Sequence, residues 1–246
     1  MDERQGVDAR EVAKFEAQAA TWWDPSGPFA ALHAMNPCRL AYAVDQIALV
    51  HGRDTRGRRA FEGLRVLDVG CGGGLMAEPM ARLGAEVVAI DAAGASLPVA
   101  RAHAEGQGRA IDYREARAED LAAGGERFDA VMALEIVEHV PEPQGFLDAC
   151  ARLVAPGGVM LVSTISRTPK AWALAIVAAE RVLGWLPRDT HDWRRFVTPE
   201  ELATMLSAAG LTPVDAKGMV FDLAERAWRL SASDLSVNYL ACAERR

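Results

Sequence analysis

The chain has little of several features that mark particular classes of protein. Its 246 residues include only four cysteines and no Cys-x-x-Cys pair, so we expect neither a disulfide framework nor a zinc site of the usual spacing. The net charge of -7 argues against a nucleic-acid binder, which needs a basic surface. No stretch reaches the roughly 18 to 20 apolar residues of a membrane-spanning helix. The N-terminus is charged and lacks the apolar core of a secretory signal, so we expect a cytoplasmic protein.

The rest of the composition is typical of a globular α/β domain, with half of the residues hydrophobic and a quarter charged. From residue 65 onward, short apolar stretches alternate with stretches of helical periodicity, which indicates βαβ units and a parallel sheet. The predicted strands are 65–69, 86–90, 110–114, 128–134, 159–164, 211–217 and 237–242. Predicted helices end near Leu83, Glu105 and Val154, and another begins after Thr198, its N-cap. Pro79 falls inside the first of these helices and should bend it.

Two segments are additions to this pattern, within a single predicted domain that spans residues 1–246. The first 60 residues form a predicted helical extension. Apolar residues at helical spacing predict an amphipathic helix over 8–23, and a second helix is predicted from about Pro37, at its start, to Val50. The other addition is an insert at 166–195, after the fifth predicted strand.

Four glycines lie between the first predicted strand and the following helix, in the run VLDVGCGGG (66–74). Ligands of open α/β sheets bind at the carboxyl ends of the strands, where glycine lets the backbone approach them, and Gly70 and Gly72 form the tight part of this loop. The third glycine of the dinucleotide-binding fingerprint would fall at Leu75, which weakens an NAD interpretation. Asp91 ends the second predicted strand, where a carboxylate can accept hydrogen bonds from both hydroxyls of an adenosine ribose.

The chain resembles the class I S-adenosylmethionine-dependent methyltransferases at the run 66–74, at Asp91, at 128–140 and at the Pro-Gly-Gly turn 156–158. The resemblance implies a Rossmann-like α/β fold with a seven-stranded, mostly parallel sheet whose last strand is antiparallel. It implies S-adenosylmethionine as methyl donor, with Gly70 and Gly72 facing its methionine part. It further implies that Asp91 holds the ribose and that Leu134 offers its backbone to the cofactor.

A closer resemblance covers nearly the whole chain. The segments 7–40, 190–202 and 234–240 resemble the bacterial ubiquinone-biosynthesis O-methyltransferases, although Ser96 and Ser166 depart from that pattern. The resemblance implies methylation of a polyprenylated phenol or catechol at two steps, with 2-polyprenyl-6-hydroxyphenol and 3-demethylubiquinol as acceptors. It implies that Arg39 pairs with the methionyl carboxylate, a role that suits a forked and permanently charged donor. Other proteins of ubiquinone biosynthesis are the implied partners.

Three residues after the fourth predicted strand form a candidate metal site. Glu135, Glu138 and His139 stand at i, i+3 and i+4, a spacing that places all three on one side of a helical turn. Two carboxylates and an imidazole suit a divalent metal, and the hard oxygens favour Mg²⁺. A catechol chelating that ion would have the pKa of its hydroxyl lowered. The alternative is a solvated polar turn without metal, in which case His139 or His191 is the candidate general base.

The insert carries six Lys and Arg against three Asp and Glu over 167–195, so its local charge is +3 and the remaining residues sum to -10. Three of the six tryptophans lie there, and 13 of the 16 residues in 171–186 are apolar. Such a composition is typical of a segment that lies on an anionic membrane surface, here the inner face of the cytoplasmic membrane. The alternative is a lid packed on the protein's own core.

Three other functions stay open from the sequence. A methyltransferase of the same fold could act on another hydrophobic small-molecule acceptor. An NAD-dependent oxidoreductase would need the glycine that Leu75 replaces. A non-catalytic module would bind the cofactor without turnover, although the polar residues at 135–139 argue for an enzyme.

Overall fold

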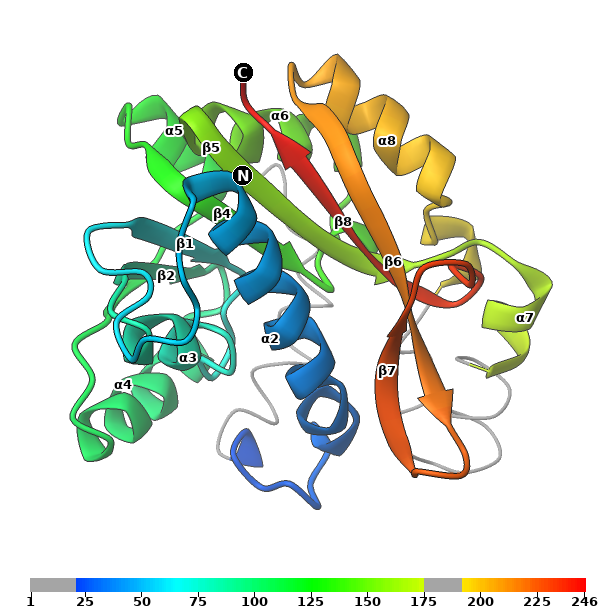
Figure 1. Cartoon of the computed structure of the whole chain (residues 1–246), viewed down its shortest axis with the longest axis horizontal. Helices are drawn as coiled ribbons and strands as arrows, with labels where there is room; N and C mark the ends of the chain where they lie inside the picture. Colours follow the sequence, from blue (N-terminus) through cyan, green and yellow to red (C-terminus); the bar gives the residue numbers. More distant parts are fainter. Residues whose placement is uncertain (1–20, 175–191) are drawn as a thin grey trace, which may run out of the picture.

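The structure, a computed structural model, describes residues 21–174 and 192–246 (Figure 1). Within these residues one sheet has the strand order β3-β2-β1-β4-β5-β8-β6-β7. The strands from β3 to β5 run parallel, β8 runs antiparallel to both neighbours, and β7 runs antiparallel to β6. The strands are β1 (Arg65–Val69), β2 (Glu86–Asp91), β3 (Asp112–Glu115), β4 (Phe128–Leu134), β5 (Val154–Ile165), β6 (Thr212–Asp222), β7 (Ala227–Ser231) and β8 (Asn238–Glu244). The predicted α/β architecture with an antiparallel last strand is confirmed.

Helices cover both faces of the sheet. Successive side chains of a strand point to opposite faces; Val66 and Met132 therefore join the core beneath α2, α3 and α4, whereas Leu67 and Val131 join the core beneath α5, α6 and α8. The α-helices are α2 (Ala30–His51), α3 (Ala77–Arg82), α4 (Leu97–Gly106), α5 (Ala118–Ala123), α6 (Pro143–Leu153), α7 (Pro169–Ala171) and α8 (Pro199–Ala208). Short 3₁₀ helices are η2 (Gly94–Ser96), η3 (Val137–His139) and η5 (Trp193–Arg195).

The described part of the sheet has eight strands, one more than predicted. Strand β6 continues to Asp222 and the chain turns back as β7, with the rings of Phe221 and Trp228 5.7 Å apart across the hairpin. The side chains of β7 are exposed or half-buried. Only Trp228 and Leu230 pack against the core, as partly buried side chains, so the strand is short and its alternating pattern is weak in the sequence.

One of the two predictions about prolines in helices is wrong. Helix α2 begins at Ala30, so Pro37 lies inside it and not at its start; burial of its neighbours Met35 and Cys38 holds the helix together across the missing N–H. Pro79 lies inside α3, as predicted, in its first turn. The backbone N–H groups of Glu78 and Met80 donate to the carbonyls of Gly74 and Met76, so the N–H that Pro79 lacks leaves the carbonyl of Leu75 without a helical donor. The bend at Pro79 stays a prediction.

Thr198 caps α8 as predicted. Its side chain accepts a hydrogen bond from the backbone of Glu201, whose carboxylate accepts one from the backbone of Thr198. Residues 8–20 of the predicted amphipathic helix and residues 175–191 of the insert lie outside the described part of the chain. Among the described helices, none combines the length and the hydropathy needed to cross a bilayer.

Candidate active site

The predicted cofactor residues of the sheet lie at the carboxyl ends of adjacent parallel strands. Gly70 and Gly72 follow β1, Asp91 ends β2, and Leu134 ends β4. Strand β1 pairs in parallel with both β2 and β4. Parallel neighbours end at the same edge of a sheet, so the fold brings these residues together.

The glycine loop depends on its glycines in two ways. Gly70, Gly72 and Gly74 have φ values of 70°, 50° and 90°, a left-handed conformation that other residues adopt only at a cost. A Cβ added at Gly70 would overlap the side chain of Ile136. The backbone N–H groups of Gly70 and Cys71 both donate to the carbonyl of Ile90, at 2.8 and 3.0 Å, which ties the loop to the end of β2.

Asp91 anchors the same loop. Its Oδ2 accepts a hydrogen bond from the backbone N–H of Gly72 at 2.8 Å, and its Oδ1 accepts one from Ala93 at 2.7 Å. Burial raises the pKa of this carboxyl, and the two backbone donors oppose that rise. Each carboxylate oxygen can accept a second hydrogen bond, so Asp91 can hold the glycine loop and bind ribose hydroxyls at once.

Arg39 projects from α2 and is 4% exposed. Its Nη2 donates to Asn36 Oδ1 at 3.0 Å and to the carbonyl of Leu32 at 3.4 Å. Its buried Nε has no acceptor among the described residues. Burial lowers the pKa of the guanidinium, and the charges of Glu135 and Asp68 oppose this. A buried cation with an unused donor is suited to bind a carboxylate.

Asp68 is a site residue that sequence reasoning missed. It lies within β1 and is 4% exposed, and its Oδ2 has no hydrogen-bond partner among the described residues. Burial raises the pKa of Asp68 to about 7, against the opposing charge of Arg39. In the sequence, a single acidic residue within the apolar run 66–69 is the signal that could have identified Asp68.

The acidic residues beyond β4 are held by hydroxyl groups of β5. Glu135 has a φ of 59°, and its Oε1 accepts a hydrogen bond from Ser163 Oγ at 2.6 Å. Glu138 is 4% exposed, and its Oε2 accepts from Thr164 Oγ1 at 2.8 Å. Glu138 Oε1 is buried with no partner among the described residues. Sequence reasoning missed both hydroxyls.

The predicted helical turn of the candidate metal site is only partly formed. Glu138 and His139 lie on η3, whereas Glu135 precedes it in a left-handed conformation. Burial and the charge of Glu135 raise the pKa of Glu138, and His139 opposes the rise. Within residues 21–174 and 192–246, no group of three His, Cys, Asp or Glu side chains is arranged to hold a metal ion. The metal ligands stay a prediction, and so does the choice of general base, because His191 lies outside the described residues.

The described ends of the insert meet, since Trp193 Nε1 donates to the carbonyl of Thr168 at 3.4 Å. Trp172 and Leu174 are about half exposed. The remainder of the insert, with Trp185, is outside the described residues.

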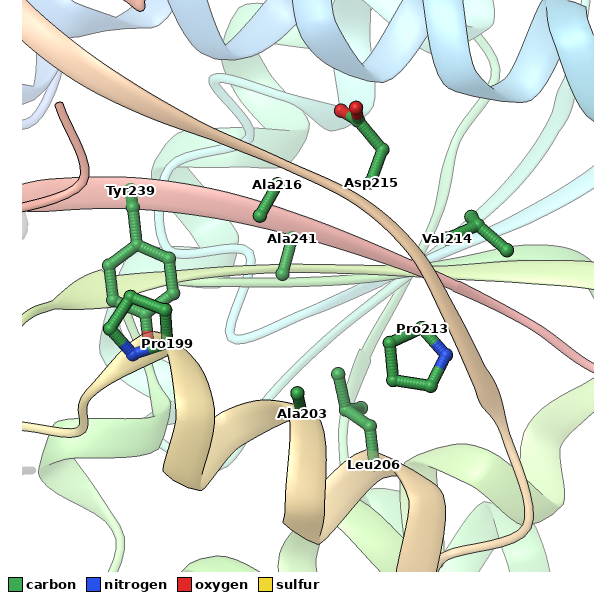
Figure 2. A pocket seen from close by; sticks show the side chains of 9 residues that line it. All are labelled: Pro199, Ala203, Leu206, Pro213, Val214, Asp215, Ala216, Tyr239 and Ala241. Atoms are coloured by element: carbon green, nitrogen blue, oxygen red, sulfur yellow. The ribbon is translucent and has the colours of Figure 1, made fainter. Parts of the chain in front are cut away.

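A separate apolar groove lies between α8 and the strands β6 and β8 (Figure 2). In Figure 2 the side chain of Asp215 points away from the groove, toward α2. The backbone carbonyl of Asp215 accepts a hydrogen bond from the hydroxyl of Tyr42 on α2. None of the predicted site residues lines this groove. It is therefore distinct from the candidate active site.

Comparison with known proteins places the chain in a family. The family described as "Methyltransferase domain" matches residues 40–216. A ubiquinone biosynthesis O-methyltransferase of Dinoroseobacter shibae is 59% identical over 98% of this chain and 97% of its own length. The protein of the same name from Cereibacter sphaeroides strain KD131 is 57% identical over the full length of both chains. This chain belongs to the ubiquinone biosynthesis O-methyltransferase family.

Solved structures of more distant proteins share the family's fold. Magnesium protoporphyrin IX methyltransferase from Synechocystis, with bound S-adenosylhomocysteine, matches with a TM-score of 0.64 and 19% identity over 95% of each chain. The N-methyltransferase NodS from Bradyrhizobium japonicum matches with a TM-score of 0.60 and 16% identity, over 96% of this chain and 98% of its own. The predicted class I methyltransferase fold is confirmed.

Proposed function

We propose that this member of the ubiquinone biosynthesis O-methyltransferase family transfers the methyl group of S-adenosylmethionine to a phenolic oxygen of 2-polyprenyl-6-hydroxyphenol and of 3-demethylubiquinol. The observation that carries the proposal is the glycine loop fastened to Asp91, next to the end of β4 and its acidic residues. Arg39, buried near Asp68 and Glu135, adds a cation suited to the methionyl carboxylate.

Methyl transfer asks the protein mainly for positioning, because the sulfonium of the cofactor is already activated. Asp91 would hold the ribose and Arg39 the carboxylate, so both ends of the cofactor would be fixed. The acceptor must also lose its phenolic proton. His139 and His191 are the candidate bases from the sequence, and the carboxylate of Glu138 is a further group near the end of β4 that can receive it.

A divalent cation such as Mg²⁺, with Glu135, Glu138 and His139 as ligands, is a further part of the proposal. Glu138 Oε1 supports it as a buried oxygen without a partner among the described residues. Ser163 and Thr164 hold one oxygen of each carboxylate, as second-sphere donors of metal sites do. When bound, such an ion would lower the pKa of a catechol hydroxyl.

Methyl transfer from radiolabelled S-adenosylmethionine tests the acceptor. We expect label in a short-tailed demethylubiquinol and less in a simple catechol that lacks the tail. Treatment with EDTA should reduce labelling, and Mg²⁺ should restore it. Unchanged labelling after EDTA would remove the metal from the proposal and leave the acceptor intact. Labelling of an unrelated phenol alone would replace the acceptor with another hydrophobic molecule.

The insert is proposed to rest on anionic lipid, which would place the protein at the inner face of the cytoplasmic membrane and admit a polyprenyl tail. Half-exposed Trp172 and Leu174 support this, as do Arg194 and Arg195 at the other described end of the insert, which meets the first end through Trp193 and Thr168. We expect co-sedimentation with anionic liposomes, lost in a Trp172→Glu/Leu174→Glu variant and kept in the control Leu49→Glu, whose leucine is 75% exposed on α2. Wild type that stays in the supernatant would contradict it.

A further inference from the structure

Trp22 lies directly on the glycine loop, although its role was not predicted. The indole is 6% exposed, and a Cβ added at Gly72 or at Gly73 would overlap its ring. Gly73 has no left-handed φ to explain the absence of a side chain. The close approach of Trp22 is a reason for glycine at that position.

The indole N–H of Trp22 is a buried donor that none of the described residues satisfies. Buried tryptophan N–H groups usually have a partner, because a buried donor left unpaired destabilises the protein. The atoms of Trp22 nearest to a Cβ built on Gly73 are Cδ1, Cγ and Nε1. The unpaired donor is thus on the part of the ring that faces the loop. An unpaired N–H donor beside the glycine loop is explained by a ligand that accepts its hydrogen bond when the ligand is bound.

The same helix that carries Arg39 positions Trp22. The ring of Phe29, the N-cap of α2, lies against that of Trp22, with centroids 3.9 Å apart and ring planes tilted by 34°. His33 Nε2 donates to the carbonyl of Trp22 at 2.8 Å. One turn further, Asn36 donates to the carbonyl of Leu75 at 3.0 Å and accepts from Arg39. Leu75 in turn packs against Trp22. Asn36 therefore links Arg39 to Leu75, the neighbour of Trp22, and both Trp22 and Arg39 have a buried N–H without a partner among the described residues.

We propose that Trp22 Nε1 is a second donor, beside Arg39, to the carboxylate of the methionine part of the cofactor. A carboxylate has enough lone pairs for both donors, and hydrogen bonds to a charged acceptor are stronger than neutral ones. The inference rests on the proposed function, since it takes S-adenosylmethionine as the ligand. The neighbouring Trp23 also has an unpaired indole N–H, but its ring stacks on His103 with ring centroids 3.5 Å apart, and none of its atoms is among those nearest to a Cβ built on the loop glycines.

Calorimetry with two ligands separates a donor from a packing residue. S-adenosylhomocysteine carries the carboxylate, whereas 5′-methylthioadenosine lacks the amino-acid part. Trp22→Phe keeps an aromatic ring and removes the N–H, so we expect about a tenfold or greater loss of affinity for S-adenosylhomocysteine. Affinity for 5′-methylthioadenosine should stay within about twofold. Arg39→Met should show the same selectivity, and Trp23→Phe, the matched control, should change neither affinity.

Equal losses for both ligands, or no loss for either, would overturn the proposal. Failure of wild type to bind S-adenosylhomocysteine would instead overturn the proposed function. If Trp22→Phe does not fold, NMR spectroscopy of the wild-type protein tests the same hydrogen bond. The ¹⁵N-indole resonance of Trp22 should move downfield on addition of S-adenosylhomocysteine and not with 5′-methylthioadenosine; equal shifts with both ligands would contradict the assignment.

Discussion

Asp91→Asn is expected to lower the affinity for S-adenosylhomocysteine by about tenfold to a hundredfold. The carboxylate accepts backbone hydrogen bonds from Gly72 and Ala93, one on each oxygen. An asparagine side chain has one acceptor oxygen, so its amide nitrogen would face one of these N–H donors. That unsatisfied donor is present with and without ligand, so its cost of about 1–3 kcal/mol lowers the free energy of unfolding and not the affinity. The affinity falls because the ribose hydroxyls lose a charged acceptor, which costs about 1.5–3 kcal/mol, or about one to two powers of ten in the dissociation constant.

Calorimetric titration measures this change, and urea unfolding shows whether the variant is folded. Asp112→Asn is the matched control, because exposed Asp112 lies on the adjacent strand β3 and pairs with half-buried Arg114. We expect this control to bind like wild type. An Asp91→Asn variant that is folded and binds normally would show that Asp91 only fastens the loop and does not contact the ribose.

The residues that could be predicted from sequence are those whose role is local. The glycine loop and Asp91 each follow a strand with a clear apolar pattern, and the parallel sheet alone brings their ends together. Strand β4 was predicted with its observed bounds, because its residues are nearly all buried. The role of Arg39 was predicted only from the family resemblance. Nothing in the neighbouring sequence distinguishes Arg39 from a surface cation.

The residues that were missed act through contacts between distant parts of the chain. Thr164 meets Glu138 across 26 residues, and Trp22 meets Gly73 across about twice that separation. The sequence around a hydroxyl in a strand, or around a tryptophan before a turn, has no periodicity that predicts such a contact. Tertiary packing also explains why α2 continues through Pro37, since local propensity is a weak guide where neighbouring side chains are buried.

Asp68 leads to a prediction about stability and pH. Burial raises its pKa from 3.8 to about 7 in the folded protein. Between these two values the native state keeps a proton that the unfolded chain releases, so unfolding becomes easier as the pH rises. The stabilising contribution of Asp68 is fully present below its unfolded pKa and is lost as the pH rises through about 7. The total change is up to about 4 kcal/mol, at about 1.4 kcal/mol for each unit of pKa.

Asp68→Asn should remove this dependence, because asparagine is a neutral side chain of similar shape. Urea unfolding of both proteins at pH 5, 6, 7 and 8 measures it. The free energy of unfolding of wild type minus that of Asp68→Asn should fall from pH 5 to about pH 7 and level off toward pH 8. Taking the difference cancels the titration of groups that the two proteins share.

A flat profile would change the interpretation of Arg39. A difference that does not change from pH 5 to pH 8 would mean that Asp68 is already charged in the native state and serves as the permanent counter-ion of Arg39. The expected trend means instead that the native state favours a neutral Asp68 below about pH 7. Arg39 then has one counter-charge fewer, and its unused Nε is left for a carboxylate from outside the chain. The pH dependence therefore tests whether the buried cation is prepared for a ligand or already neutralised by the protein.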